Sequence, residues 1–149
     1  MIEIYTDGSC WPNPGSSGGW SFVAYRDGVE FFALNGKAEG FTSSNRMELT
    51  AMLRALMWLG ERPGRVFSDS RYVVDGLNSW CHAWARRGWM RRDKDTKQLQ
   101  PVLNADLWQV LMIAKMPQHT VAWVKGHAGI TGNERADQLA EAAREGVPA

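Results

Sequence analysis

The chain has 149 residues, of which 44% are hydrophobic and 22% are charged, and its formal net charge at pH 7 is +1. This size suits one globular domain over residues 1–149, and two cysteines are too few for a secreted disulfide framework. No apolar run reaches the about 18 residues of a membrane span, and the first residues lack a signal-peptide pattern. We therefore expect a cytoplasmic monomer with no membrane partner.

The first third of the chain predicts three β-strands. Hydrophobic and β-branched residues gather at 2–7, 20–26 and 30–39. A segment rich in glycine, proline and serine separates the first two strands, and the hairpin signal Asp27-Gly28 lies between the others. These features indicate an antiparallel meander of three strands.

Helices and shorter strands alternate over the rest of the chain. A helix is predicted from about Asn45 to Leu59, with an apolar stripe at Met52, Ala55, Leu56 and Leu59. A strand at 65–69, helices at 71–80 and 105–116, a strand at 119–125 and a helix from about Thr131 follow. This order predicts an α/β fold in which a mixed sheet joins the meander to parallel strands and carries helices on both faces.

Positive charge is concentrated near one segment. Residues 86–97 contain six basic and two acidic residues, whereas the rest of the chain contains eleven basic and fourteen acidic ones. Trp80, Trp84 and Trp89 lie among these cations, and flat aromatic surface beside Arg and Lys suits a sugar-phosphate chain. The alternatives are a solvated charged face and a helix face that Trp80 and Trp84 bury at i and i+4.

Four carboxylates come together in the predicted topology. Asp7 and Asp69 end parallel strands, at the sheet edge where open α/β sheets carry their sites. Glu48 extends the apolar stripe of its helix, and Asp137 flanks the buried stripe of the last helix. Each acid also has a structural explanation: Asn45 with Glu48 and Thr131 with Glu134 fit capping boxes, and Asp137 suits a helix start.

Taken together, four carboxylates at one edge repel each other unless a cation compensates or a proton is taken up. A site made only of oxygen ligands, without cysteine or clustered histidine, favours Mg²⁺, with Mn²⁺ as a substitute. The sequence therefore predicts a metal site at this edge of the sheet.

Five ordered motifs extend over nearly the whole chain: YTDGSC, NRMEL, SDSRYV, RRGW and VKGHAGITGNERAD. They resemble the ribonuclease H type 1 family in its bacterial form. The resemblance implies a five-stranded mixed sheet and hydrolysis of the RNA strand of an RNA/DNA hybrid, which leaves a 5′-phosphate and a 3′-hydroxyl. It also implies two metal ions with substrate bound, held by Asp7, Glu48, Asp69 and Asp137.

His127 is the expected fifth catalytic residue. Gly126 and Gly129 are expected to make its loop flexible, and an unperturbed imidazole titrates near neutral pH. These properties suit a proton shuttle. In the family that the motifs resemble, this histidine assists proton transfer or departure of the cleaved phosphate.

Substrate contacts are expected along two surfaces. Uncharged polar groups and backbone amides would read the 2′-hydroxyls of RNA, and the DNA strand would contact a basic protrusion at about 80–101. The expected substrate-binding residues are Cys10, Asn13, Ser43, Ser44, Asn45, Arg71, Trp80, Trp84, Arg86 and Arg87. Turn and cap chemistry remains the alternative for the two asparagines.

Some residues depart from the family pattern. Ser43-Ser44 stands where Thr-Asn is common, and Arg71 stands where Gln often follows the Asp-Ser pair. We expect weaker phosphate or 2′-hydroxyl contacts from the first change and an added cation near the hybrid from the second. Because the chain opens on the first strand, no N-terminal hybrid-binding module is expected.

Three other classes of protein compete with this hypothesis. A non-catalytic nucleic-acid-binding domain of the same fold would lack at least one of the four acids. A nuclease with another substrate, such as a DNA strand cutter, would lack the asparagines and the basic extension. A purely structural domain would not gather carboxylates at strand ends.

Overall fold

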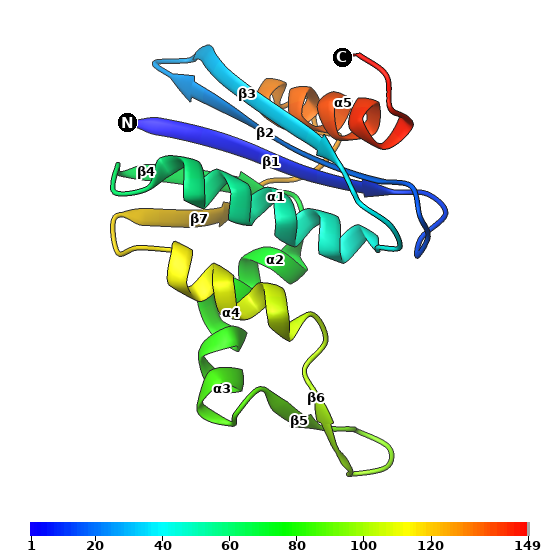
Figure 1. The fold of residues 1–149 in the computed structure, drawn as a ribbon. Coiled ribbons are helices and arrows are strands. Elements are labelled where there is room, and N and C mark those ends of the chain that lie inside the picture. The colour runs from blue at the N-terminus through cyan, green and yellow to red at the C-terminus, as the bar shows by residue number, and fades with distance from the viewer. Residues whose placement is uncertain (149) are drawn as a thin grey trace.

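A five-stranded sheet in the order β3-β2-β1-β4-β7 forms the centre of the computed structural model, which describes residues 1–148 (Figure 1). The first three strands pair antiparallel, whereas β4 pairs parallel with both β1 and β7. The predicted mixed α/β fold is therefore confirmed. The strands are β1 Ile2–Cys10, β2 Gly18–Arg26, β3 Val29–Lys37, β4 Gly64–Ser68 and β7 His119–Trp123.

Helices cover both faces of this sheet, as predicted. Helix α1 (Ser44–Leu59) packs against β1 and β2 and is covered in turn by α4 (Ala105–Ala114). The opposite face packs against α5 (Thr131–Glu145), where Ala136 and Leu139 meet Val23 (Figure 1). Within residues 1–148, no helix has both the length and the apolar character that crossing a membrane requires.

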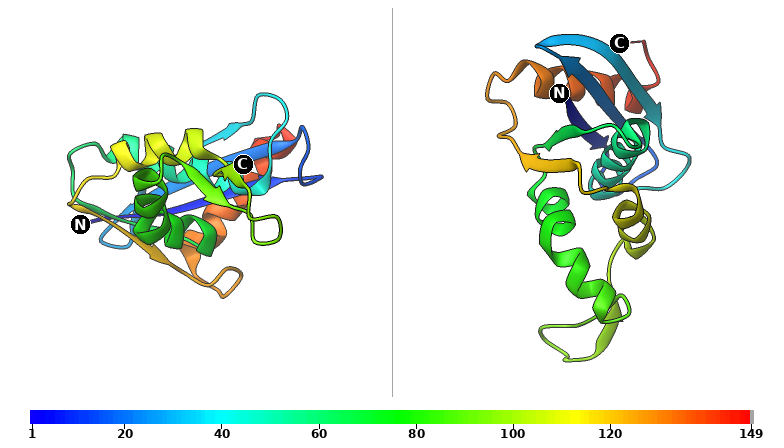
Figure 2. Two further views of the ribbon diagram at one scale, coloured as in Figure 1. Left: turned by 90° about the horizontal axis from the view of Figure 1, so that it is seen from below. Right: turned by 90° about the vertical axis from the view of Figure 1, so that its left-hand side faces the viewer.

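The helix predicted at 71–80 is longer than expected and contains a π-turn. It consists of α2 (Arg71–Asp75), the π-helical turn η1 (Gly76–Trp80) and α3 (Cys81–Arg86). A hairpin of β5 (Met90–Arg92) and β6 (Leu99–Pro101), which the sequence analysis did not predict, follows it. Together they extend away from the sheet (Figure 2, right). We call residues 80–101 the basic protrusion.

Strand β1 is also longer than predicted. It continues three residues beyond Asp7 because Gly8 to Cys10 pair with β2, whereas its parallel pairing with β4 stops at Tyr5. Asp7 therefore lies where the parallel half of the sheet has ended and the antiparallel half continues. The carboxylate is still at the edge where the sequence analysis placed it, but at this residue β1 pairs only with β2 and no longer with β4.

Neither capping box that was offered as an alternative explanation for the acids forms in α1 or α5. The N-cap of α1 is Ser43, whose hydroxyl accepts the backbone N–H of Arg46, so Asn45 already lies inside the helix. Helix α5 begins after Ile130, which makes no side-chain cap hydrogen bond, and Thr131 is its first residue. Glu48 is thus not a capping residue and is left available for another role.

Candidate active site

Three acids from separate elements meet at the edge of the sheet. Asp7 lies on β1, Glu48 on the first turns of α1, and Asp69 directly after β4. One carboxylate oxygen from each lies within 4.8 Å of the others. We call Asp7, Glu48 and Asp69 the acid cluster. Parallel pairing of β1 with β4 brings the two aspartates together, and α1 adds the glutamate from above the sheet.

Close packing of α1 on β1 holds Glu48 beside Asp7. The Gly8 backbone N–H donates to Oε1 of Glu48, and the Ser68 hydroxyl donates to Oε2 at 3.4 Å. A Cβ at position 8 would overlap the backbone of Met47 and Glu48. Glycine is required there because helix and strand backbones touch, so that the glutamate reaches the aspartate.

Burial and mutual repulsion govern the charge of the acid cluster. Asp7 and Glu48 are only 6% and 7% exposed. Burial raises the pKa of Asp7, as do the neighbouring Glu48, Asp69 and Asp137. Burial also raises the pKa of Glu48, although hydrogen bonds from Asp7, Gly8 and Ser68 oppose this effect. The group retains a proton that an isolated pair of carboxylates would release at neutral pH.

The same environment fits a hard divalent cation. All the converging atoms are carboxylate oxygens, which Mg²⁺ and Mn²⁺ prefer, and a bound cation would remove the repulsion that now favours protonation. Asp137, half-buried on α5, lies outside the group of three but forms a hydrogen bond with Asp7 that contributes to its raised pKa. Asp7 therefore has neighbouring carboxylates from both α1 and α5.

A buried asparagine that the sequence analysis missed holds Asp69. Asn133 is 2% exposed, and its Nδ2 donates to Oδ2 of Asp69 at 3.2 Å. It lies on the first turn of α5, four residues before Asp137, and therefore on the same helix face. This spacing was the available signal, because a polar residue one turn before a predicted ligand on one face belongs to the same site.

His127 lies exposed in the loop between β7 and α5 with a positive φ of 54°. Gly126 also has a steric role, because a Cβ there would press against the carboxylate of Asp69. The loop therefore lies against the acid cluster at Gly126, the residue directly before His127. His119 is different: it is buried, and its two ring nitrogens contact Met116 N and Arg62 O.

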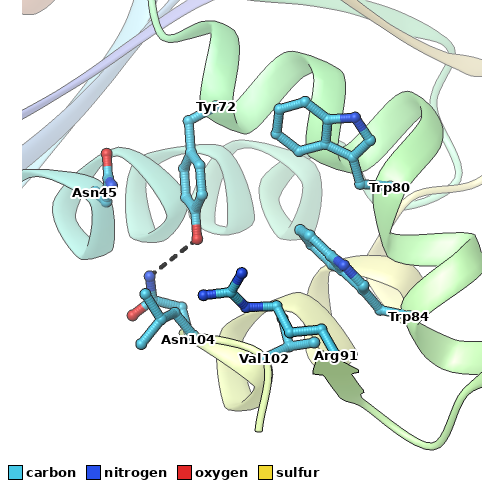
Figure 3. A pocket seen from close by; sticks show the side chains of 8 residues that line it. Asn45, Tyr72, Trp80, Trp84, Arg91, Val102 and Asn104 are labelled. Carbon is cyan, nitrogen blue, oxygen red and sulfur yellow. Dashed lines mark hydrogen bonds between the residues drawn. The ribbon is translucent and has the colours of Figure 1, made fainter. Parts of the chain in front are cut away.

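The expected 2′-hydroxyl readers lie around the start of α1. Asn13 Oδ1 accepts the Ser44 N–H at 2.9 Å, which connects the loop after β1 to the helix. Ser43 caps the helix, and the Cys10 thiol is buried and donates to Pro12 O. The cap chemistry offered as the alternative thus exists at Asn13, whereas the exposed Asn45 side chain lines a neighbouring pocket (Figure 3).

That pocket, of about 320 Å³, lies between α1 and the basic protrusion (Figure 3). The two tryptophans differ in their surroundings: Trp80 is 43% exposed, whereas Trp84 packs edge-on against Trp108. Arg86 and Arg87 are exposed at the end of α3. Arg71 lies apart from them, with its guanidinium 4.0 Å from the centre of the Trp123 ring.

A family model described as RNase H matches residues 1–145. The chain belongs to the ribonuclease H family. The ribonuclease H of Dechloromonas aromatica is 46% identical to it over 143 residues, which cover 93% of this chain and 90% of that protein. The ribonuclease H of Acidiphilium cryptum is 47% identical over 150 residues, which cover 99% and 88% respectively. The resemblance inferred from the motifs is confirmed, and the family is one of nucleases.

Solved structures of ribonuclease H proteins share the fold. LC9-RNase H1, a type 1 RNase H with the type 2 active-site motif, is 31% identical with a TM-score of 0.74, over 99% of this chain and 73% of that one. LC11-RNase H1, whose structure is in complex with RNA/DNA hybrid, is 22% identical with a TM-score of 0.67, over 98% of each chain. The second similarity concerns the fold alone.

Replacement of Asp7 by asparagine should stabilise the metal-free protein at neutral and alkaline pH. Because folding raises the pKa of Asp7, the wild type loses stability as pH rises above about 4, where an unfolded aspartate ionises. Asp7→Asn removes this loss in the free energy of unfolding. One unit of pKa shift corresponds to about 1.4 kcal/mol, so the Tm of the variant should be higher by at least about 3–6 °C.

Thermal unfolding with chelator at pH 5 and pH 8 measures this difference in Tm. The exposed Asp27→Asn is the control, and a variant less stable than the wild type at pH 8 contradicts the prediction.

Replacement of Asn133 by alanine should weaken cation binding by about 10- to 100-fold, since a residue that orients a ligand tunes metal affinity by that much. Calorimetric titration with Mg²⁺ measures the effect. Asn35→Ala is the matched control, because Asn35 also donates its Nδ2 to α5, at Leu139 O, but touches no acid of the cluster. Equal affinities in the two variants would count against a role for Asn133 at Asp69.

Proposed function

We propose that this protein hydrolyses the RNA strand of RNA/DNA hybrids as an endonuclease, with two divalent cations, and leaves 5′-phosphate and 3′-hydroxyl ends. The observation that carries the proposal is the acid cluster, in which three carboxylates from three elements converge within 4.8 Å. Membership of the ribonuclease H family supports the substrate class. LC11-RNase H1 and a foamy viral protease-reverse transcriptase were each solved in complex with RNA/DNA hybrid.

Asp7, Glu48, Asp69 and Asp137 would hold the cations, which are Mg²⁺ or, as a substitute, Mn²⁺. When bound, such ions supply an activated water and stabilise the charge of the leaving oxygen. Asp7 is the proposed shared ligand because it interacts with Glu48, Asp69 and Asp137. Gly8, Ser68 and Asn133 would keep the carboxylates oriented through their hydrogen bonds.

His127 would move protons at the rim of the acid cluster. Its imidazole is exposed and lies next to Gly126, which contacts Asp69. An imidazole both accepts and donates protons near neutral pH, which suits transfer to a departing 3′-oxygen. This is an assisting role, so the carboxylates would be more important for the reaction than the histidine.

The hybrid would extend from the loops around α1 to the basic protrusion. Asn13, Ser43, Ser44, Asn45 and the backbone at Cys10 would read the 2′-hydroxyls of the RNA strand. The DNA strand would lie on Trp80 and Trp84, with Arg71, Arg86 and Arg87 nearest its phosphates. The proposal includes one catalytic domain over 1–149, acting as a monomer in the cytoplasm.

Hybrid cleavage tests the proposal directly. Labelled RNA/DNA hybrid, RNA duplex, DNA duplex and single strands are incubated with the protein, with Mg²⁺ or with chelator. Only the RNA of the hybrid should be cut, and only with the cation. Asp7→Asn should abolish cleavage, whereas His127→Ala should slow turnover markedly and leave some activity. Equal loss in both variants would refute the assisting role, and cleavage of every duplex would refute the substrate assignment.

The basic protrusion should act in binding more than in turnover. Replacing Arg86, Arg87, Arg91 and Arg92 with alanine should raise KM for the hybrid and leave kcat little changed. The log-log salt dependence of binding should become shallower by about one unit for each phosphate that the variant no longer neutralises. A control replaces three arginines near the opposite end of the sheet, Arg26, Arg62 and Arg65, and should leave KM and the salt slope nearly unchanged. An unaltered KM and salt slope would rule out the protrusion as a binding surface.

A further inference from the structure

Tyr72 lies between the acid cluster and the basic protrusion. It is in the first turn of α2, three residues after Asp69, and its side chain enters the pocket that Trp80 and Trp84 also line (Figure 3). Its hydroxyl oxygen accepts hydrogen bonds from Nδ2 of Asn104 at 3.1 Å and from Nε1 of Trp108 at 3.2 Å. None of the roles assigned so far uses this tyrosine.

The direction of these hydrogen bonds is fixed because two of the groups involved can only donate. The Arg46 guanidinium donates to Oδ1 of Asn104 at 3.1 Å, so the amide must present its NH₂ to Tyr72. The indole of Trp108 is likewise only a donor. The Tyr72 oxygen is therefore a double acceptor, and phenylalanine at this position would leave two donors without a partner, one of them on a fully buried tryptophan.

This hydrogen-bonded set joins the elements that carry the acids to both ends of the protrusion. Arg46 lies on α1, two residues before Glu48, and also forms a bidentate pair with Asp106 at the start of α4, at 3.0 and 2.8 Å. Asn104, with a positive φ of 61°, lies three residues after the protrusion ends. We call Arg46, Tyr72, Asn104, Asp106 and Trp108 the Tyr72 network.

Trp108 extends the network to the other end of the protrusion. A Cβ at Gly76, the first residue of the π-turn, would overlap the Trp108 ring, and Trp84 packs edge-on against the same ring. The indole thus contacts the helix where it changes geometry and again where it enters the protrusion. Its position depends in turn on the Tyr72 hydroxyl.

We propose that Tyr72 is a positioning residue that fixes the distance between the DNA-binding face of the basic protrusion and the acid cluster, and so selects which phosphodiester of the RNA strand is cut. The inference rests on the proposed function. Contacts to the phosphate backbone set the register of a protein on a duplex, so the distance from those contacts to the carboxylates defines the cleaved position. Loss of the network lets this distance vary.

Mapping of cleavage positions tests the inference. A hybrid of one defined sequence, with end-labelled RNA, is cut by the wild type, Tyr72→Phe and Asp106→Ala under single-turnover conditions below the Tm of each protein. Tyr72→Phe should spread the cuts over about two neighbouring positions. In a separate steady-state assay with excess hybrid, its KM should rise about threefold or more, with kcat nearly unchanged. Asp106→Ala, which frees only the outer end of the network, should act in the same direction and less strongly.

Tyr25→Phe is the matched control, because Tyr25 belongs to the other face of the sheet, where it packs with Tyr5 and α5. It should leave the cleavage pattern and KM as in the wild type. A lowered Tm for Tyr72→Phe with wild-type cleavage positions and KM would make Tyr72 merely structural and overturn the inference, as would the same spreading in Tyr25→Phe. A wild type that leaves the hybrid intact would instead overturn the proposed function, and the inference with it.

Discussion

Repulsion between buried carboxylates is the constraint around which this end of the molecule is organised. Asp7 and Glu48 are almost excluded from solvent, yet their oxygens lie within 4.8 Å of each other and of Asp69. The fold tolerates this arrangement because packing and hydrogen bonds offset the repulsion between the carboxylates. Gly8 lets two backbones touch, and Ser68 and Asn133 donate hydrogen bonds to the acids. Such a group is stable either with an extra proton or with a cation, which makes folding and ligand binding interdependent.

The acid cluster and the basic protrusion lie in separate parts of the molecule. The acids lie at the edge of a rigid sheet, whereas the exposed arginines and Trp80 lie on a protrusion that is built from one helix and a short hairpin. Helix α2 connects these two parts: it begins two residues after Asp69 and continues into the π-turn at Gly76. Side chains add to the rigidity of the spacing between them, above all Tyr72 and Trp108, because the Trp108 ring packs on both Gly76 of the π-turn and Trp84 of the protrusion.

The sequence was sufficient for what depends on periodicity and order, and insufficient for what depends on long-range contact. Alternation and the Asp27-Gly28 turn identified the meander, and the stripe ending at Leu59 identified α1. The hairpin at 90–101 was missed because its residues are mostly polar and exposed, so no apolar pattern marks its strands. The capping box offered as the alternative for Glu48 does not form, because the Glu48 carboxylate accepts the N–H of Gly8, forty residues away in sequence, which local patterns do not reveal. For the site, the ends of the strands were enough to locate the aspartates. The spacing of Asn133 from Asp137 placed it on the same helix face, but its contact with Asp69 depends on how α5 packs and is seen only in the structure.

The tight turn at Asp27-Gly28 has a practical meaning for handling the molecule. It follows Arg26, which pairs with Ile2, so it lies beside the start of β1, whereas Asp7 is further along the same strand (Figure 1). Gly28 has a positive φ of 77°, and nothing lies within 4 Å of the place where its side chain would be. A dye, a surface linker or a short peptide tag inserted there would leave the opposite end of the sheet open to solvent. Immobilised or fluorescent forms of the protein are best made at this turn.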